Sequence, residues 1–150
     1  MATWSEVETA EPAFAARVRT VLDAHKHKTI ATLRADGAPR ISGIEVQFAD
    51  GELTFGSMPN ARKGADLRRD PRFALHASST APPDGQEATW AGDAKVAGVA
   101  VPAGLVEGME GELFKADLRE VVLTALNPEA TMLRIEWWTP ERGLRCVERA

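Results

Sequence analysis

A candidate anion-binding segment lies near the middle of the chain, at Gly56-Ser57-Met58-Pro59-Asn60-Ala61-Arg62-Lys63. The segment follows an expected strand and opens an expected helix. Cations at a helix N-terminus oppose the helix dipole unless something negative binds there, and the free N–H groups of the first turn point at the same place. Arg62 offers a planar fork and Lys63 a point charge. Both are therefore candidate ligands of a terminal phosphate; the alternative is a solvated charged turn.

Arg40 and Ser42 form a second candidate feature, in the expected strand 40–48. Even-numbered residues of that strand share one face, and its apolar members predict that this face is the core. Unless a β-bulge shifts the register, a guanidinium and a hydroxyl point inward or into a cleft. A buried arginine needs an acceptor. That acceptor is either a ligand or a core carboxylate such as Glu45 or Glu136.

Histidine and cysteine give little indication of catalysis or metal binding. His25 and His27 have no carboxylate at metal-ligand spacing, so we expect a solvated helix end and no metal site. Cys146 is the single cysteine and cannot form an internal disulfide. None of the GxSxG, HExxH, Walker and GxGxxG patterns is present, and the catalytic residues are therefore unknown.

The Trp137-Trp138 pair lies in the expected strand 131–138. Alternation places Trp137 with Leu133 and Ile135 on one face and Trp138 on the other. We expect Trp138 to be exposed, where it would contact a partner subunit or a planar ligand.

The elements that position these residues alternate between short strands and a few helices. Apolar residues at helical spacing predict a helix at about 10–25, with Ser5 and Glu8 as a possible capping box before it. Two Asp-Gly turns join strands 29–34, 40–48 and 52–57 into an antiparallel meander. Asn60 is the expected cap of a helix over 61–69.

The second half of the chain continues the same pattern. We expect a strand at 72–78, a loop at 79–92, a strand at 94–101, a weak helix at 102–114, and strands at 115–126, 131–138 and 143–147. Many short strands with few helices predict a mainly β fold, a small antiparallel barrel with peripheral helices.

Composition limits the classes of protein. The chain has 150 residues, 44% hydrophobic residues and a net charge of −4, which indicates one globular domain spanning 1–150. No apolar run is long enough to cross a membrane, and no signal peptide is evident, so we expect a cytoplasmic protein. The acidic total argues against nucleic-acid binding, although five of the 18 basic residues lie between Arg62 and Arg72.

The segment 28–76 closely resembles the pyridoxamine 5′-phosphate oxidase-like, FMN-binding split-barrel family, especially its small actinobacterial-type members. The resemblance rests on the order of the first hairpin, Pro-Arg-x-Ser, Gly-Ser, Arg-Lys and Leu-Arg-Arg-Asp-Pro-Arg; Gly92–Gly98 is similar to the family's next strand. It implies a six-stranded antiparallel split barrel and a homodimer with the flavin in an interface cleft. An N-terminal helix would occupy 1–27, barrel strands one to five 28–101 with the short helix at 61–69, and the C-terminal strands 102–150.

The same resemblance implies roles for particular residues. Arg62 and Lys63 would bind the flavin phosphate. The remaining cofactor-binding candidates are Arg40, Ser42, Gly43 and Ile44 beside the isoalloxazine, Gly56, Ser57 and Met58 near the ring or ribityl chain, and Trp138 and Arg145 from the late strands.

The implied function is an FMN-dependent oxidoreductase that transfers hydride through the flavin N5 and acts with a small-molecule substrate or an electron donor such as NAD(P)H. Residues 143–149 differ from the Arg-Leu-His-Asp-Arg stretch of the true oxidases, and their long N-terminal extension is missing, so pyridoxamine phosphate is not the expected substrate. The alternatives are an F420-dependent (deazaflavin) reductase, a flavin-binding or storage protein without turnover, a haem-binding branch, and a basic interaction module at 62–72. Residues 79–92 and 102–114 are expected to shape the substrate pocket.

Overall fold

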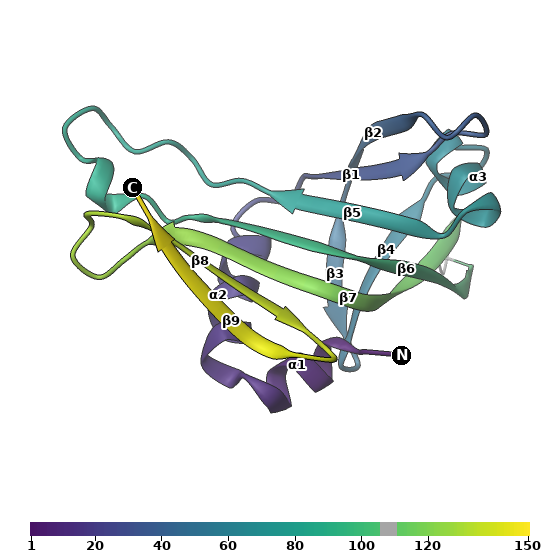
Figure 1. The fold of residues 1–150 in the computed structure, drawn as a ribbon. Coiled ribbons are helices and arrows are strands. Elements are labelled where there is room, and N and C mark those ends of the chain that lie inside the picture. The colour runs from purple at the N-terminus through teal and green to yellow at the C-terminus, as the bar shows by residue number, and fades with distance from the viewer. Residues whose placement is uncertain (106–110) are drawn as a thin grey trace.

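A single antiparallel sheet dominates the computed structural model, which describes residues 1–105 and 111–150 (Figure 1). Within these residues the sheet has nine strands. They are β1 (Lys28–Leu33), β2 (Pro39–Ile44), β3 (Val46–Ala49), β4 (Glu52–Ser57), β5 (Arg72–Ala77), β6 (Asp93–Leu105), β7 (Glu112–Leu126), β8 (Leu133–Thr139) and β9 (Gly143–Arg149).

The sheet closes into a split barrel through a bend at Glu45. The strand order is β2-β1-β5-β6-β7-β4-β3, so the two ends of the path are β2 and β3, which Glu45 joins directly. The strand expected at 40–48 therefore bends into two segments, one paired with β1 and the other with β4. Counted as one bent strand, β2–β3 gives the closed path the six strands expected.

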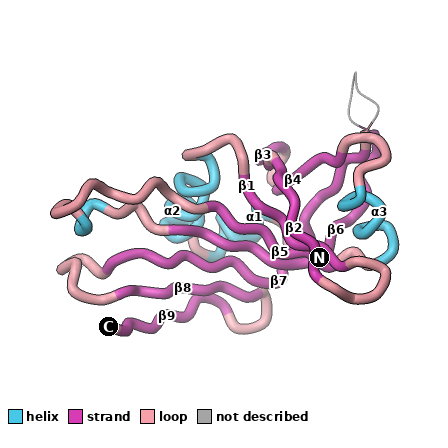
Figure 2. Tube along the Cα trace, turned by 90° about the horizontal axis from the view of Figure 1, so that it is seen from above, coloured by secondary structure: helices cyan, strands magenta, loops and turns pink. Residues whose placement is uncertain are grey.

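The long strand β7 divides the barrel from its extension. Its first residues pair with β4, from Glu112 opposite Ser57 to Lys115 opposite Thr54. Its second half pairs with β8 instead, and β8 in turn pairs with β9. One strand thus belongs both to the barrel and to a C-terminal extension, in which Figure 2 shows β7, β8 and β9 side by side.

The N-terminal helical region consists of two helices rather than one. These are α1 (Trp4–Ala10) and α2 (Pro12–Asp23), and they pack under the sheet in Figure 1. The capping box is Thr3 with Glu6, not Ser5 with Glu8: the Thr3 side chain accepts from Glu6 N, and Glu6 accepts from Thr3 N. Pro12 takes the first position of α2, where its missing N–H costs nothing.

The core lies between these helices and the barrel. Its largest fully buried side chains include Trp4, Leu22, Ile30, Phe55 and Phe114. Phe55 lies with its ring centre 5.9 Å from that of Phe114, stacked across the paired strands β4 and β7. Strand β5 buries alternate residues, as expected for a strand with one face on the core.

The helix expected at 102–114 is wrong in the described part of that range. Strand β6 continues through Pro102 to Leu105 and β7 already begins at Glu112, because each supplies the other's backbone hydrogen-bond partners. Residues 106–110 lie outside the described part. The loop 79–92 contains one short 3₁₀ turn, Glu87–Thr89, and projects from the end opposite α3 (Arg62–Arg69) (Figure 1). Among the described helices, none has the length and apolar character needed to span a bilayer.

Candidate functional site

Helix α3 starts after the short loop that follows β4, and it has no side-chain cap. Asn60, the expected cap, has a left-handed backbone with φ of 60°, and the cap position belongs to Ala61, whose methyl group cannot accept a hydrogen bond. The first turn carries no acidic residue. The positive end of the helix dipole is therefore not compensated by a side chain of that turn.

A cavity of about 460 Å³ opens beside this helix end. Six of the predicted cofactor-binding residues line it, and they come from β2, β4, the loop after β4 and α3: Gly43, Ile44, Gly56, Ser57, Met58 and Lys63. The Lys63 ammonium donates to the Gly43 carbonyl oxygen at 3.2 Å. Its positive charge therefore lies beside the part of the cavity that β2 lines. A volume of this size is typical of small-molecule and cofactor sites.

The contact between α3 and β4 depends on Gly64. A Cβ atom at this position would lie 2.7 Å from the Ser57 hydroxyl oxygen and 3.3 Å from Ser57 Cβ. Ser57 is only 4% exposed and lines the cavity. The absent side chain of Gly64 thus lets the first turn of α3 lie directly against the cavity residue Ser57.

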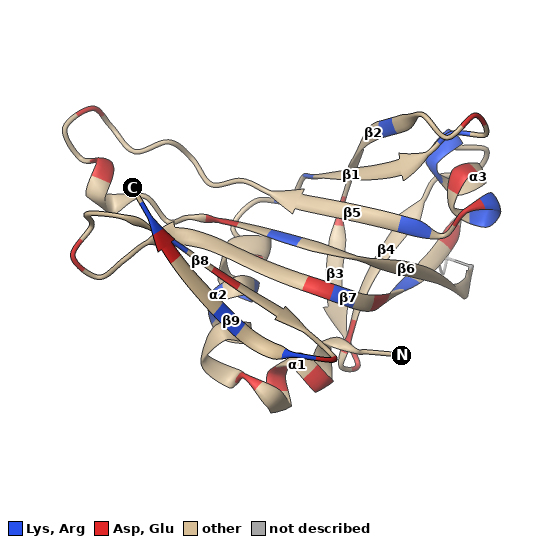
Figure 3. Ribbon diagram, in the orientation of Figure 1, with Lys and Arg blue, Asp and Glu red and all other residues tan. Residues whose placement is uncertain are grey.

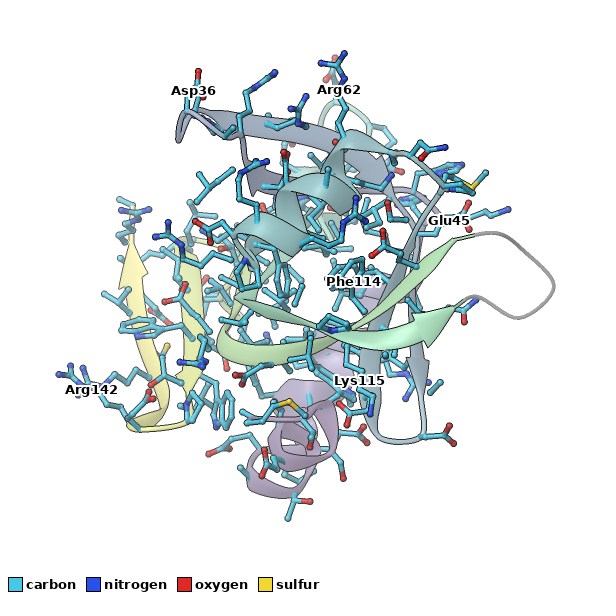
Figure 4. All side chains as sticks on the ribbon, turned by 90° about the vertical axis from the view of Figure 1, so that its right-hand side faces the viewer. Asp36, Glu45, Arg62, Phe114, Lys115 and Arg142 are labelled. Atoms are coloured by element: carbon cyan, nitrogen blue, oxygen red, sulfur yellow. The ribbon has the colours of Figure 1, made fainter. Side chains whose placement is uncertain are left out.

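Arg62 is oriented differently from Lys63. It is exposed and does not line the cavity, and Figure 4 shows its side chain reaching outward past α3 while Phe114 lies in the interior. Consecutive helix residues point about 100° apart, which is why the two neighbouring cations leave the helix in different directions. The predicted phosphate role of Arg62 stays a prediction.

The other basic residues between Arg62 and Arg72 form ion pairs with carboxylates; Figure 3 marks the basic positions in blue and the acidic ones in red. Arg68 pairs with Glu112, Arg69 with Asp66 and Arg72 with Asp70. Most of the positive charge between Arg62 and Arg72 is thus compensated locally, which disfavours a basic module that binds acidic partners.

Arg40 faces inward as expected, and its acceptor is a core carboxylate, although it is neither Glu45 nor Glu136. Its Nε donates to Asp66 Oδ2 at 2.7 Å. Ser42 shares the half-buried face, and neither it nor Arg40 lines the cavity. Glu136 instead accepts from Arg17 at 2.7 Å. The acceptor was missed because Asp66 reaches β2 only through the packing of α3.

Asp66 is almost completely buried, at 2% exposed, and accepts three hydrogen bonds. They come from Arg40, from the Thr32 hydroxyl at 2.7 Å and from Arg69 at 2.9 Å. Burial raises the pKa of Asp66, but the hydrogen bonds from Arg40, Thr32 and Arg69 outweigh it and lower the pKa to about 2. The carboxylate is therefore ionised at neutral pH.

The expected exposure of Trp138 is wrong. The alternation along β8 is as expected, but its inward face carries Glu136 and Trp138, and Trp138 is 5% exposed. It borders a different cavity, of about 540 Å³, near α1. Arg145 is exposed on β9, opposite Trp137. Within this subunit neither residue reaches the cavity beside α3, so their predicted roles stay predictions.

Seven further lining residues were not predicted: His27, Glu45, Gln47, Thr54, Phe55, Gly111 and Leu113. Glu45, at the bend, lies 3.7 Å from the Lys26 ammonium and 3.8 Å from His27 Nδ1. The Asp-Gly turns indicated the β3–β4 hairpin that carries Gln47 and Thr54. The bend and the pairing of β4 with β7 have no comparable local signal.

Comparisons with known proteins show the family to which the chain belongs. Residues 14–133 match the family model described as Pyridoxamine 5′-phosphate oxidase. No curated protein matches the sequence. A pyridoxamine 5′-phosphate oxidase-related, FMN binding protein from Nostoc punctiforme is 11% identical, with a TM-score of 0.65 over 100% of this chain and 98% of its own.

Two other solved structures have the same fold. PhzG from Burkholderia lata, in complex with tetrahydrophenazine-1-carboxylic acid, is 14% identical, with a TM-score of 0.60 over 92% of this chain and 86% of its own. A heme binding protein from Mycobacterium smegmatis is 15% identical, with a TM-score of 0.53 over 88% and 56%. At these identities the likeness concerns the fold alone. The family model, in contrast, spans most of the sequence, and the chain belongs to the pyridoxamine 5′-phosphate oxidase family.

Proposed function

We propose that the protein is an FMN-dependent oxidoreductase whose flavin occupies the cavity beside α3. The observation that carries the proposal is the position of Lys63, which lines the cavity at the uncapped start of a helix. A lysine ammonium and free backbone N–H groups form a suitable donor set for a phosphate dianion.

The cavity residues fit a flavin in other respects. Ile44, Phe55 and Leu113 supply apolar surface that would pack against a planar ring and exclude water. Ser57 offers a hydroxyl that makes only a long contact of 3.4 Å to the Met58 carbonyl, so it is available to a ligand. Glu45 is the acidic residue at the rim, and the Lys26 ammonium, 3.7 Å from its carboxylate, offsets its charge.

Bound FMN would supply hydride transfer at its N5. The chain's own contribution is binding and orientation: Lys63 and the start of α3 would hold the phosphate, and the apolar wall would hold the ring. NAD(P)H is the proposed electron donor, and the small-molecule substrate is unidentified.

We also propose that the protein acts as a cytoplasmic homodimer. Ile41 on β2 and Met58 at the cavity are 75% and 60% exposed, and removing such apolar surface from water is favourable when a partner covers it. A second copy that covered Met58 would lie against the cavity that this residue lines. Size-exclusion chromatography with light scattering, which measures the mass in solution, tests the dimer.

F420 is the alternative cofactor, because a lysine at a helix start recognises a phosphate on either molecule. A flavin-storage protein without turnover would use the same cavity. Titrations with FMN and with F420, monitored by tryptophan fluorescence, distinguish the cofactors. NAD(P)H oxidation by the flavin-loaded protein distinguishes an enzyme from a flavin-storage protein.

Single variants test the phosphate site. Lys63→Met keeps the apolar stem and removes the charge, and we expect FMN to bind about tenfold more weakly or worse, the effect of losing a hydrogen bond to a charged group. Arg62→Ala measures the role of its neighbour separately. Lys95→Met, at an exposed lysine of β6 that does not line the cavity, is the matched control. Wild-type affinity in Lys63→Met would refute the assignment.

A further inference from the structure

Helix α3 is tied to strand β2 at two points. Arg40 donates to Asp66 at 2.7 Å, and Lys63 donates to the Gly43 carbonyl oxygen at 3.2 Å. Lys63 and Asp66 are three residues apart on α3 and thus lie on neighbouring parts of one helix face. The contact that fixes Asp66 therefore lies one helical turn from the side chain proposed to hold the phosphate.

The Asp66 contact is the stronger of these two ties. Its carboxylate joins three elements, because Thr32 belongs to β1, Arg40 to β2 and Arg69 to α3 itself. Hydrogen bonds between charged groups are stronger and more directional than neutral ones. The Arg40 and Asp66 side chains are 16% and 3% exposed, so water competes little with the pair.

The geometry points to Asp66 and Arg40 as positioning residues that set the start of α3 against the β2 wall of the cavity. This inference rests on the proposed function, because the phosphate end of an FMN site is what the two residues would position. It also assigns Arg40 a role different from the one the family resemblance implies. In this role its guanidinium holds a helix in place through the hydrogen bond from Nε to Asp66.

Riboflavin, which is FMN without the phosphate, separates positioning from other effects. In Asp66→Asn we expect the dissociation constant for FMN to rise about tenfold and the affinity for riboflavin to stay unchanged. The magnitude is that of losing a residue that only orients a ligand-binding side chain, as measured for the outer partners of metal ligands. Thr32→Val removes one of the three hydrogen bonds and keeps the ion pair, so it tests the same idea if Asp66→Asn does not fold. Its expected effect is about threefold, again on FMN alone.

Asp70→Asn is the matched control. Asp70 ends α3 and pairs with Arg72 at 2.7 Å, so the variant makes the same chemical change on the same helix without touching β2. We expect wild-type affinity for both flavins.

Several results would overturn the positioning role. Equal weakening of FMN and riboflavin would indicate ring contact or general loosening, and unchanged FMN affinity in both variants would show that Asp66 does not position the site. If the wild type bound neither flavin, the proposed function itself would fail. Hydrogen exchange of the α3 amides in the flavin-free protein then still reports the tie: faster exchange in Asp66→Asn than in Asp70→Asn is expected, and equal rates would refute it.

Discussion

Gly64→Ala offers a direct test of how closely α3 packs on the cavity. The new methyl carbon would lie 2.7 Å from the Ser57 hydroxyl oxygen, well inside contact distance, and 3.3 Å from Glu112 Oε1. Ser57 is buried in the cavity wall, and Glu112 is held by Arg68. The helix must therefore shift away from β4, or Ser57 must rotate into the cavity.

The expected magnitude follows from two opposing effects. Alanine is favoured over glycine inside a helix by about 1 kcal/mol. Overpacking in a well-packed region costs about 1–3 kcal/mol. We therefore expect the free energy of unfolding to fall by about 1 kcal/mol, and FMN to bind more weakly because Ser57 and Lys63 would both move.

Urea unfolding of a double-mutant cycle measures the clash directly. Ser57→Ala removes the oxygen that the new methyl group would meet, and its own cost is small because the hydroxyl makes only one long hydrogen bond, at 3.4 Å. In the double variant we expect most of the lost stability to return. The reasoning would be refuted if Gly64→Ala raised stability by the full helix-propensity gain, or if the two changes were additive.

Two further predictions concern stability. The pKa of Asp66 is lowered from 3.8 to about 2 in the folded protein, so its contribution to the free energy of unfolding is fully present above about pH 4 and is lost as the pH falls toward 2. Acid unfolding monitored by fluorescence should therefore depend less steeply on pH in Asp66→Asn than in the wild type. An identical pH profile would contradict the shift. Trp138→Ala should lower the free energy of unfolding by about 3–5 kcal/mol because the side chain is buried. Trp137 is half-buried, and Trp137→Ala is the control with a smaller expected loss. Equal losses in guanidinium unfolding would show that the two faces of β8 do not differ in burial.

The sequence predicted most elements because their signals are local. The Asp-Gly turns define the hairpins, and the inward parity of Arg40 and Ser42 follows from the apolar residues of their own strand. The segment from Gly56 to Lys63 was correctly placed between a strand and a helix. These features need only neighbours in the chain.

What could not be predicted depends on contacts between distant segments. Asp66 becomes the partner of Arg40 only because α3 packs across β1 and β2, and Trp138 is buried because α1 and the chain start lie on that face of β8. Alternation tells which residues share a face, but not which face is covered. The segment 102–105 looked helical in isolation and is a strand because β7 pairs with it.

The bend at Glu45 makes barrel closure and ligand binding depend on the same few residues. The two outer strands of the closed path are halves of one continuous segment, and Gly43, Ile44, Glu45 and Gln47 on either side of the bend all line the cavity. A ligand bound there would contact both β2 and β3. Its affinity would therefore depend on whether the barrel is closed at this point. Loading the site should therefore slow unfolding as well as shift its equilibrium.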